Sequence, residues 1–105
     1  MKVEMTEDLK DLYETGQSKR YKDVSRNGVL LAGFVRAVKI MEQVPSSDCL
    51  KDFSFLHYEK LRYQLSGKSS VRLSNQYVHR LIFTETEDEL QVELIEIDDT
   101  HYGNK

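Results

Sequence analysis

The spacing of hydrophobic residues changes once along this chain, near residue 66, and this change constrains the fold more than any other feature. Before it, apolar side chains recur every three or four residues, which places them on one face of an α-helix. After it, they alternate with polar residues in the two-residue period of a β-strand. We therefore expect an α+β domain, with two N-terminal helices packed on one face of a small antiparallel sheet.

Two helices are predicted in the N-terminal part of the chain. The shorter one begins after Thr6, an N-cap residue, and ends at Gly16, because glycine adopts the left-handed backbone of a C-cap most easily. The longer one spans about residues 27–44, has a wide apolar face, and is ended by Pro45. Gly33 lies inside it at a cost of about 1 kcal/mol relative to alanine, which indicates close packing against a neighbouring element.

Three strands are predicted in the C-terminal third, near residues 69–74, 77–84 and 89–97. A two-residue turn at Asn75 and Gln76 is expected to join the first two strands, and an acidic turn the last two. Tyr77 is expected in the core. In the last strand the alternation changes face at Ile95, which indicates either a β-bulge or a strand end that is covered on both sides. Residues 1–5 alternate as well and are expected to add a strand at the edge of the sheet.

The composition limits the class of protein. A length of 105 residues, of which 39% are hydrophobic, suits a single domain, 1–105, with one modest core. The only cysteine, Cys49, excludes an internal disulfide and a zinc knuckle of paired thiols. The longest apolar run, residues 29–35, is far shorter than the roughly 20 residues of a membrane helix, and the N-terminus lacks a secretory pattern. We therefore expect a soluble, cytoplasmic protein with no membrane partner.

The charges are unevenly distributed along the chain. Residues 1–80 carry 14 basic and 10 acidic residues, whereas residues 81–105 carry eight acidic residues and one lysine. The formal net charge of −3 therefore hides a basic body and an acidic C-terminal quarter. The negative total argues mildly against nucleic-acid binding, but only the local patch meets phosphate, so a nucleic-acid partner stays compatible with these charges.

The groups that could carry chemistry lie in the strands and near the C-terminus. Arg72 and Arg80 fall in neighbouring predicted strands, and the run from Asp98 to Tyr102 offers two carboxylates, an imidazole and a phenol. A site that cleaves a phosphodiester needs a proton acceptor, a proton donor and fixed cations. An isolated arginine in a β-strand, however, more often has a solvated position on the surface. Spacing alone therefore does not decide between a surface position and a phosphate-binding role.

The sequence contains no motif for metal binding or for serine-hydrolase catalysis. The histidines, His57, His79 and His101, do not stand at the spacing of metal ligands, and no motif frames them. No elbow motif seats a serine nucleophile. We therefore expect neither a metal site nor a bound cofactor.

One protein family contains four segments of this kind in the same order. Here they read DLKDLYETGQSKRYKDV (8–24), VLLAGFVRAVKIMEQV (29–44), YEKLRYQLSGKSSVRLSNQY (58–77) and VELIEIDDTHYG (92–103). They resemble, respectively, the opening helix with its connector, the long helix, the arginine-bearing core and the final strand of the HigB toxins of the RelE superfamily. Each segment alone is a weak match, but together they cover nearly the whole chain at the right spacing.

The resemblance implies a metal-independent endoribonuclease that cleaves mRNA on the ribosome. In this family the ribose 2′-OH attacks the adjacent phosphate, and the enzyme is the toxin component of a type II toxin–antitoxin system that inhibits translation and growth. The implied partners are the ribosome, mRNA and a cognate antitoxin, expected to be a helix-turn-helix DNA-binding protein. Operator DNA would be bound only through the antitoxin.

The resemblance also assigns roles to particular residues. Arg72 occupies the position of the strand arginine and would hold the scissile phosphate, which suits a guanidinium fork. His101 occupies the position of the proton carrier, and its ordinary titration range near neutral pH suits that role. Asp99, two residues before it, would orient it.

Two departures from the family's pattern keep a second interpretation open. Val78 stands where the family has a second arginine, and Thr100 stands where it has a tyrosine. Arg80, on the same strand face as Val78, is a candidate to replace the missing arginine. The alternative is a catalytically weak or inactive module of the same fold that only binds its antitoxin and operator complex. The candidate RNA-binding residues are Lys60, Arg62, Lys68 and Tyr102.

Overall fold

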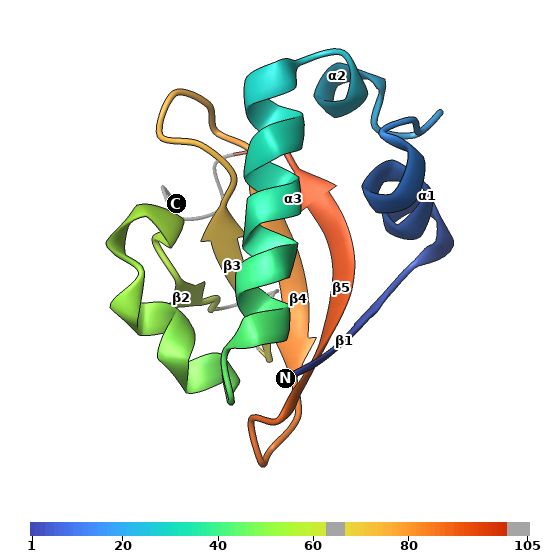
Figure 1. Cartoon of the computed structure of the whole chain (residues 1–105). Coiled ribbons are helices and arrows are strands. Elements are labelled where there is room, and N and C mark those ends of the chain that lie inside the picture. Colours follow the sequence, from blue (N-terminus) through green and yellow to red (C-terminus); the bar gives the residue numbers. More distant parts are fainter. Residues whose placement is uncertain (63–66, 101–105) are drawn as a thin grey trace.

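The computed structural model describes residues 1–62 and 67–100 and is an α+β domain, as the sequence predicts (Figure 1). Its sheet has five strands in the order β1-β5-β4-β3-β2, and α3 lies across one face. No helix in the described residues is long and apolar enough to cross a membrane. The elements are β1 (Lys2–Met5), α1 (Glu7–Thr15), α2 (Lys22–Ser25), α3 (Gly28–Gln43), the 3-10 helices η1 (Ser47–Asp52) and η2 (Ser54–Leu56), β2 (Glu59–Lys60), β3 (Lys68–Arg72), β4 (Arg80–Glu85) and β5 (Gln91–Asp98).

The predicted helix ends are confirmed. Asn27 caps α3, since its side-chain oxygen accepts hydrogen bonds from the backbone N–H groups of Val29 and Leu30 at 3.0 and 3.2 Å. Gly16 ends α1 in the left-handed conformation, with φ of 74°. Thr6 takes the N-cap position of α1, but its side chain makes no capping hydrogen bond. Acidic residues in the first turn of α1 favour the positive end of the helix dipole instead.

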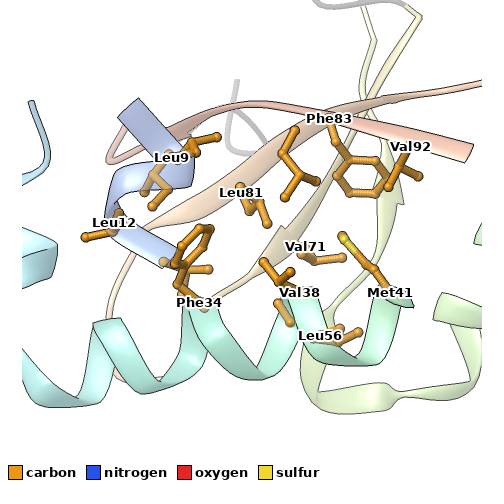
Figure 2. Packing of buried hydrophobic residues seen from close by; sticks show 14 of the residues in the cluster. Leu9, Leu12, Phe34, Val38, Met41, Leu56, Val71, Leu81, Phe83 and Val92 are labelled. Atoms are coloured by element: carbon orange, nitrogen blue, oxygen red, sulfur yellow. The ribbon is translucent and has the colours of Figure 1, made fainter. Parts of the chain in front are cut away.

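The core lies between the sheet and the two longer helices (Figure 2). Its members share a position on the inner face of a helix or on the helix-facing side of a strand. Those labelled in Figure 2 are Leu9, Leu12, Phe34, Val38, Met41, Leu56, Val71, Leu81, Phe83 and Val92. All are essentially fully buried, so this one cluster supplies the main hydrophobic stabilisation of the fold.

Gly33 brings the backbone of α3 into direct contact with the sheet. A Cβ atom at this position would lie 2.0 Å from the backbone oxygen of Leu73, closer than any real contact. The close packing predicted for this glycine is therefore confirmed. Leu73 directly follows the last residue of β3, so this contact lies at the end of that strand.

The sheet is mixed, whereas the sequence predicts an antiparallel one. The edge strand expected at residues 1–5 is confirmed as β1, but it pairs with β5 in parallel. Parallel pairing is open to β1 because nearly the whole chain separates it from β5, so no tight hairpin dictates its direction. The two-residue strand β2 was not predicted, since it is too short to show alternation.

The predicted bulge in the last strand is confirmed. Ile82 of β4 pairs with Glu96, but the next residue, Phe83, pairs with Leu94. Ile95 is therefore the extra residue, and this explains why the apolar alternation changes face there.

The turn predicted at Asn75 and Gln76 is present, since the backbone N–H of Tyr77 donates to the Ser74 oxygen at 3.4 Å, but the strands do not reach it. β3 ends at Arg72 and β4 begins at Arg80, so residues 73–79 form the connection between them. The strand predicted at 77–84 therefore begins three residues later in the structure than expected. No glycine is present to favour a tight hairpin turn. Ser74 holds this turn, with its hydroxyl accepting from the backbone N–H of Gln76 at 3.1 Å. Tyr77 consequently lies outside the core and is 36% exposed.

Glu85, at the end of β4, is a partly buried carboxylate rather than part of a solvated turn. The Tyr58 hydroxyl donates to its two oxygens at 2.8 and 3.0 Å, and the Ser69 hydroxyl donates to Oε1. Burial alone would raise the pKa of the Glu85 carboxyl, but hydroxyl hydrogen bonds outweigh burial, and with nearby Lys60 they lower the pKa below its ordinary value. The network ties the segment before β2 to β3 and β4.

Replacing Glu85 with glutamine is expected to reduce the acid sensitivity of the fold. The folded-state pKa of Glu85 lies below the unfolded value of about 4.3, so the ionised carboxylate stabilises the protein above that pH. This contribution is lost as the pH falls through the folded-state pKa. Glu85→Gln should therefore lower the Tm near neutral pH, and the difference from wild type should shrink in acid.

Thermal unfolding followed by circular dichroism at several pH values measures this difference. Glu87→Gln, which changes an exposed acid in the same turn, is the matched control and should follow the wild-type profile. A Tm difference for Glu85→Gln that stays constant from neutral pH to acid would contradict the assignment.

Candidate functional site

The strand register places three charged residues in one row across the sheet. Arg72, the last residue of β3, lies opposite Arg80, the first of β4, and Arg80 lies opposite Asp98, the last of β5. Directly opposed residues have side chains on the same face of a sheet. Their neighbours Val71 and Leu81 belong to the core under α3, so this row lies on the face of the sheet away from α3.

Arg80 is held rigidly in this row. Its Nε donates to the Ser70 hydroxyl at 2.7 Å, and its Nη2 donates to the backbone oxygen of His57 at 2.8 Å. The same Nη2 lies 3.3 Å from a carboxylate oxygen of Glu59. Burial lowers the pKa of the Arg80 guanidinium, Glu59 opposes this, and the positive charge of Arg72 adds to it. The two guanidinium groups therefore lie close enough to repel each other electrostatically.

Arg72 contrasts with Arg80 because it lacks a counter-charge. Across residues 1–62 and 67–100, no carboxylate lies within 4.0 Å of its guanidinium. Its Nε is buried and has no hydrogen-bond partner in that same part of the chain. A buried donor without an acceptor costs free energy, so it needs an explanation. A guanidinium of this kind is suited to take the oxygens of a phosphate in a two-pronged hydrogen bond.

Asp99 lies away from the arginine row. Its carboxylate lies beside His79 and Asp23, and the acid that shares the row with the arginines is its neighbour Asp98. The resemblance assigned the orienting role to Asp99 and none to Asp98. His101 and Tyr102 lie outside the described residues.

The three basic candidates for RNA contact are divided between two faces of the sheet. Lys68 alternates with Ser70 and Arg72 along β3, so it shares their face. Lys60 pairs in register with Ser69, and its charge acts on Glu85 on the side that faces the helices. Arg62, just beyond β2, is exposed. Lys68 is therefore the basic candidate on the same face as the arginine row.

The residues that hold Arg80 were not found by sequence reasoning. Ser70, Glu59 and the His57 backbone oxygen come from β3, β2 and the end of η2. His57 itself has a left-handed backbone, with φ of 48°, and its ring nitrogen contacts the Asn75 side chain at 3.0 Å. No periodicity or motif links these positions, because only the pairing of β2 with β3 brings them to Arg80.

Comparison with known proteins identifies the fold. No protein-family model and no curated protein matches the sequence. Among solved structures, a YoeB/ParE toxin from Agrobacterium tumefaciens matches with a TM-score of 0.60 and 16% identity, covering 95% of this chain and 99% of the toxin. The YoeB-YefM complex of Staphylococcus aureus gives 0.57 and 18%, covering 97% and 98%. The YoeB dimer of the same organism gives 0.53 and 16%, with the same coverage.

These matches define the class of fold. The chain has the same α+β fold as these YoeB and ParE toxins over nearly its whole length. The matched structures are YoeB and ParE toxins, so the HigB subtype that the sequence suggests stays a prediction.

Proposed function

We propose that this protein is the toxin of a type II toxin–antitoxin system and acts as a ribosome-dependent mRNA endoribonuclease. The observation that carries the proposal is the Arg72 guanidinium, partly buried and without a counter-charge in the described residues, at the strand end of a toxin-like fold. A fixed cation of this kind is what cleavage of a phosphodiester requires. The resemblance of the sequence to RelE-type toxins supplies the substrate and the ribosome.

In the proposed reaction the ribose 2′-OH attacks the adjacent phosphate and no metal takes part. Arg72 binds two phosphate oxygens and offsets the negative charge that develops on them. Arg80 adds a second positive charge and, through its own hydrogen bonds, keeps the strand ends in place. His101 carries the proton. DNA lacks the 2′-OH and would not be cut.

The remaining residues act on binding and position. Asp99, close to His101 in sequence, orients the segment that carries this histidine. Lys68, on the face of Arg72, and exposed Arg62 contact the RNA backbone, where positive charge offsets phosphate. Lys60 and Tyr102 are further contacts suggested by the resemblance.

Mapping cuts in a cellular mRNA tests the proposed function. After a pulse of induction, primer extension on a reporter mRNA should reveal new ends within the translated frame only. The same reporter with its start codon removed should stay intact, because the ribosome presents the RNA. Equal cutting of both reporters would exclude dependence on the ribosome.

The alternative, an inactive module of the same fold, is favoured by one observation. Arg80, the candidate replacement for the arginine missing at Val78, already donates to Ser70 and to the His57 backbone. An arginine engaged in this way has less capacity to bind phosphate. Growth arrest upon induction of the wild-type chain would exclude this alternative, whereas normal growth with the folded protein present would favour it.

The partner in the proposed system is an antitoxin, and α3 offers it a surface. A shallow groove on the outer side of α3 is lined by apolar Leu31, Ala32 and Val35 and by basic Arg36 and Lys39. An amphipathic segment with acidic flanks fits such a groove, since the apolar stripe and the two positive charges would both be matched.

Adding a negative charge to this groove is expected to weaken the antitoxin complex. Ala32 is exposed, so Ala32→Glu leaves the core unchanged while it opposes an acidic partner. Co-purification with the product of a neighbouring reading frame measures binding, and Lys10→Glu on the exposed side of α1 is the control. Equal recovery of the partner by wild type and Ala32→Glu would exclude this groove as the docking site.

A further inference from the structure

A cluster of three metal-binding side chains lies on the helix-facing side of the sheet. Asp23 of α2, His79 of the connection before β4 and Asp99 after β5 each bring one ligand atom within 4.8 Å of the other two. Within this cluster, the His79 Nε2 lies 2.7 Å from an Asp23 oxygen. The three residues come from separate parts of the chain, and the proposed function assigns no metal to them.

The cluster is separate from the arginine row. His79 continues the pairing of β4 with β3, because its backbone oxygen accepts from the N–H of Leu73 at 3.2 Å. Leu73 is a core residue, so His79 faces the helices. Arg80 is the next residue of this extended segment and therefore points to the other face.

The electrostatics of the cluster favour a cation. Two carboxylates lie within 4.8 Å of each other, and in the described part of the chain neither has a lysine or arginine within 4.0 Å. The only ion-pair partner of Asp23 there is His79. In the described residues the polar contact of the His79 ring is the one that its Nε2 makes with Asp23 inside the cluster, and its Nδ1 is buried without a partner. A divalent ion would offset the repulsion between the two carboxylates.

We propose that Asp23, His79 and Asp99 form a zinc site that fastens α2 to the end of β5. One imidazole nitrogen with two carboxylate oxygens is a mixed ligand set that suits zinc, and an open fourth position is left to water. Magnesium and calcium prefer ligand sets made of oxygen alone. The geometry needs a small adjustment. Ligands of a tetrahedral zinc ion are roughly 3.3 Å apart, so binding opens the contact between His79 and Asp23 by about 0.6 Å.

A bound zinc ion would stabilise a part of the fold that is weak on its own. α2 has only four residues, and one turn of helix is not stable in isolation. Zinc binds the folded arrangement and not the unfolded chain, so it should raise the Tm as its concentration rises above Kd.

Cobalt serves as a spectroscopic probe for the site. The full-length protein, freed of any histidine tag, is titrated with Co²⁺, and visible absorption of the bound ion is recorded before zinc is added to displace it. We expect one Co²⁺ per chain, displacement by Zn²⁺ and no displacement by Mg²⁺. His79→Gln and Asp99→Asn should each weaken binding by about 100-fold or more, because each removes one of three ligands.

Controls separate this site from weak surface binding. Asp99 is exposed, so Asp99→Asn reports on the site even if His79→Gln disturbs the packing of α2. His57→Gln, at a histidine that contacts Asn75 and not this cluster, should bind Co²⁺ like wild type. No saturable Co²⁺ binding by the wild type would overturn the proposal, and so would unchanged binding by Asp99→Asn or equal loss in His57→Gln. None of these outcomes depends on RNA cleavage, so they do not test the proposed function.

Discussion

Replacing Arg72 with alanine is expected to abolish growth arrest while leaving the protein as stable as the wild type or more stable. The wild-type side chain buries an Nε that has no acceptor among residues 1–62 and 67–100 and is repelled by Arg80, so its removal relieves two unfavourable terms. Cleavage of mRNA should fall by about 10²–10³-fold, because the developing charge on the phosphate loses its fixed cation. Thermal unfolding and the rate of mRNA cleavage measure the two effects on the same preparation.

Three further variants sharpen this result. Arg72→Lys keeps the charge but loses the two-pronged geometry, so its activity should lie between those of wild type and Arg72→Ala. His101→Gln cannot carry a proton near neutral pH and should slow cleavage by about 10²–10⁴-fold, with a smaller loss for Asp99→Asn. Arg26→Ala, at an exposed arginine far along the chain from these residues, is the control and should cut normally. If folded Arg72→Ala arrests growth as fast as wild type, Arg72 does not bind the scissile phosphate.

Replacing Gly33 with alanine is expected to destabilise the protein by about 3 kcal/mol, although alanine is the better helix former. The added Cβ would lie 2.0 Å from the Leu73 oxygen, and both atoms belong to rigid backbone, so α3 must move off the sheet. For a domain of this size the Tm should fall by more than about 10 °C.

The matched control for this change is in the same helix. Gly28, at the start of α3, has nothing within 4 Å of an added Cβ, so Gly28→Ala should leave the Tm close to that of the wild type. Differential scanning calorimetry measures the Tm of the two variants. Equal Tm values for Gly33→Ala and Gly28→Ala would show that α3 does not depend on this contact. Because the contact is next to Arg72, Gly33→Ala should also reduce cleavage.

The sequence predicts the parts of this fold that depend on local periodicity. The apolar stripe of α3, the glycine at its contact with the sheet and the bulge at Ile95 each leave a mark in consecutive residues, and all three are confirmed. The turn at Asn75 and Gln76 was placed correctly, but the strands beside it were predicted too long, because the seven-residue connection that contains it has no comparable signature. The strand β2, with two residues, is too short to have one.

The candidate site is predicted less completely, for a related reason. Arg72 and Arg80 fall in adjacent strands, so their neighbourhood could be anticipated once the hairpin was recognised. The metal-binding cluster could not be anticipated from the sequence. Its ligands are 56 and 20 residues apart and meet only after α2 packs beside the ends of the strands. Asp99 was assigned by resemblance to the phosphate site, whereas the structure places it with His79. The roles of His101 and Tyr102 stay predictions.

The attack of a ribose 2′-OH on its own phosphate is the central claim, and a single atom in the substrate tests it. The measurement is cleavage of an end-labelled mRNA on translating ribosomes by the purified protein, compared with the same mRNA carrying one 2′-deoxynucleotide at the cut position. We predict cleavage of the all-ribose mRNA, with a 5′-hydroxyl on the downstream product, and no cut at the deoxynucleotide. Cleavage at the deoxynucleotide, or no cleavage of ribosome-bound mRNA by the wild-type protein, would contradict the account.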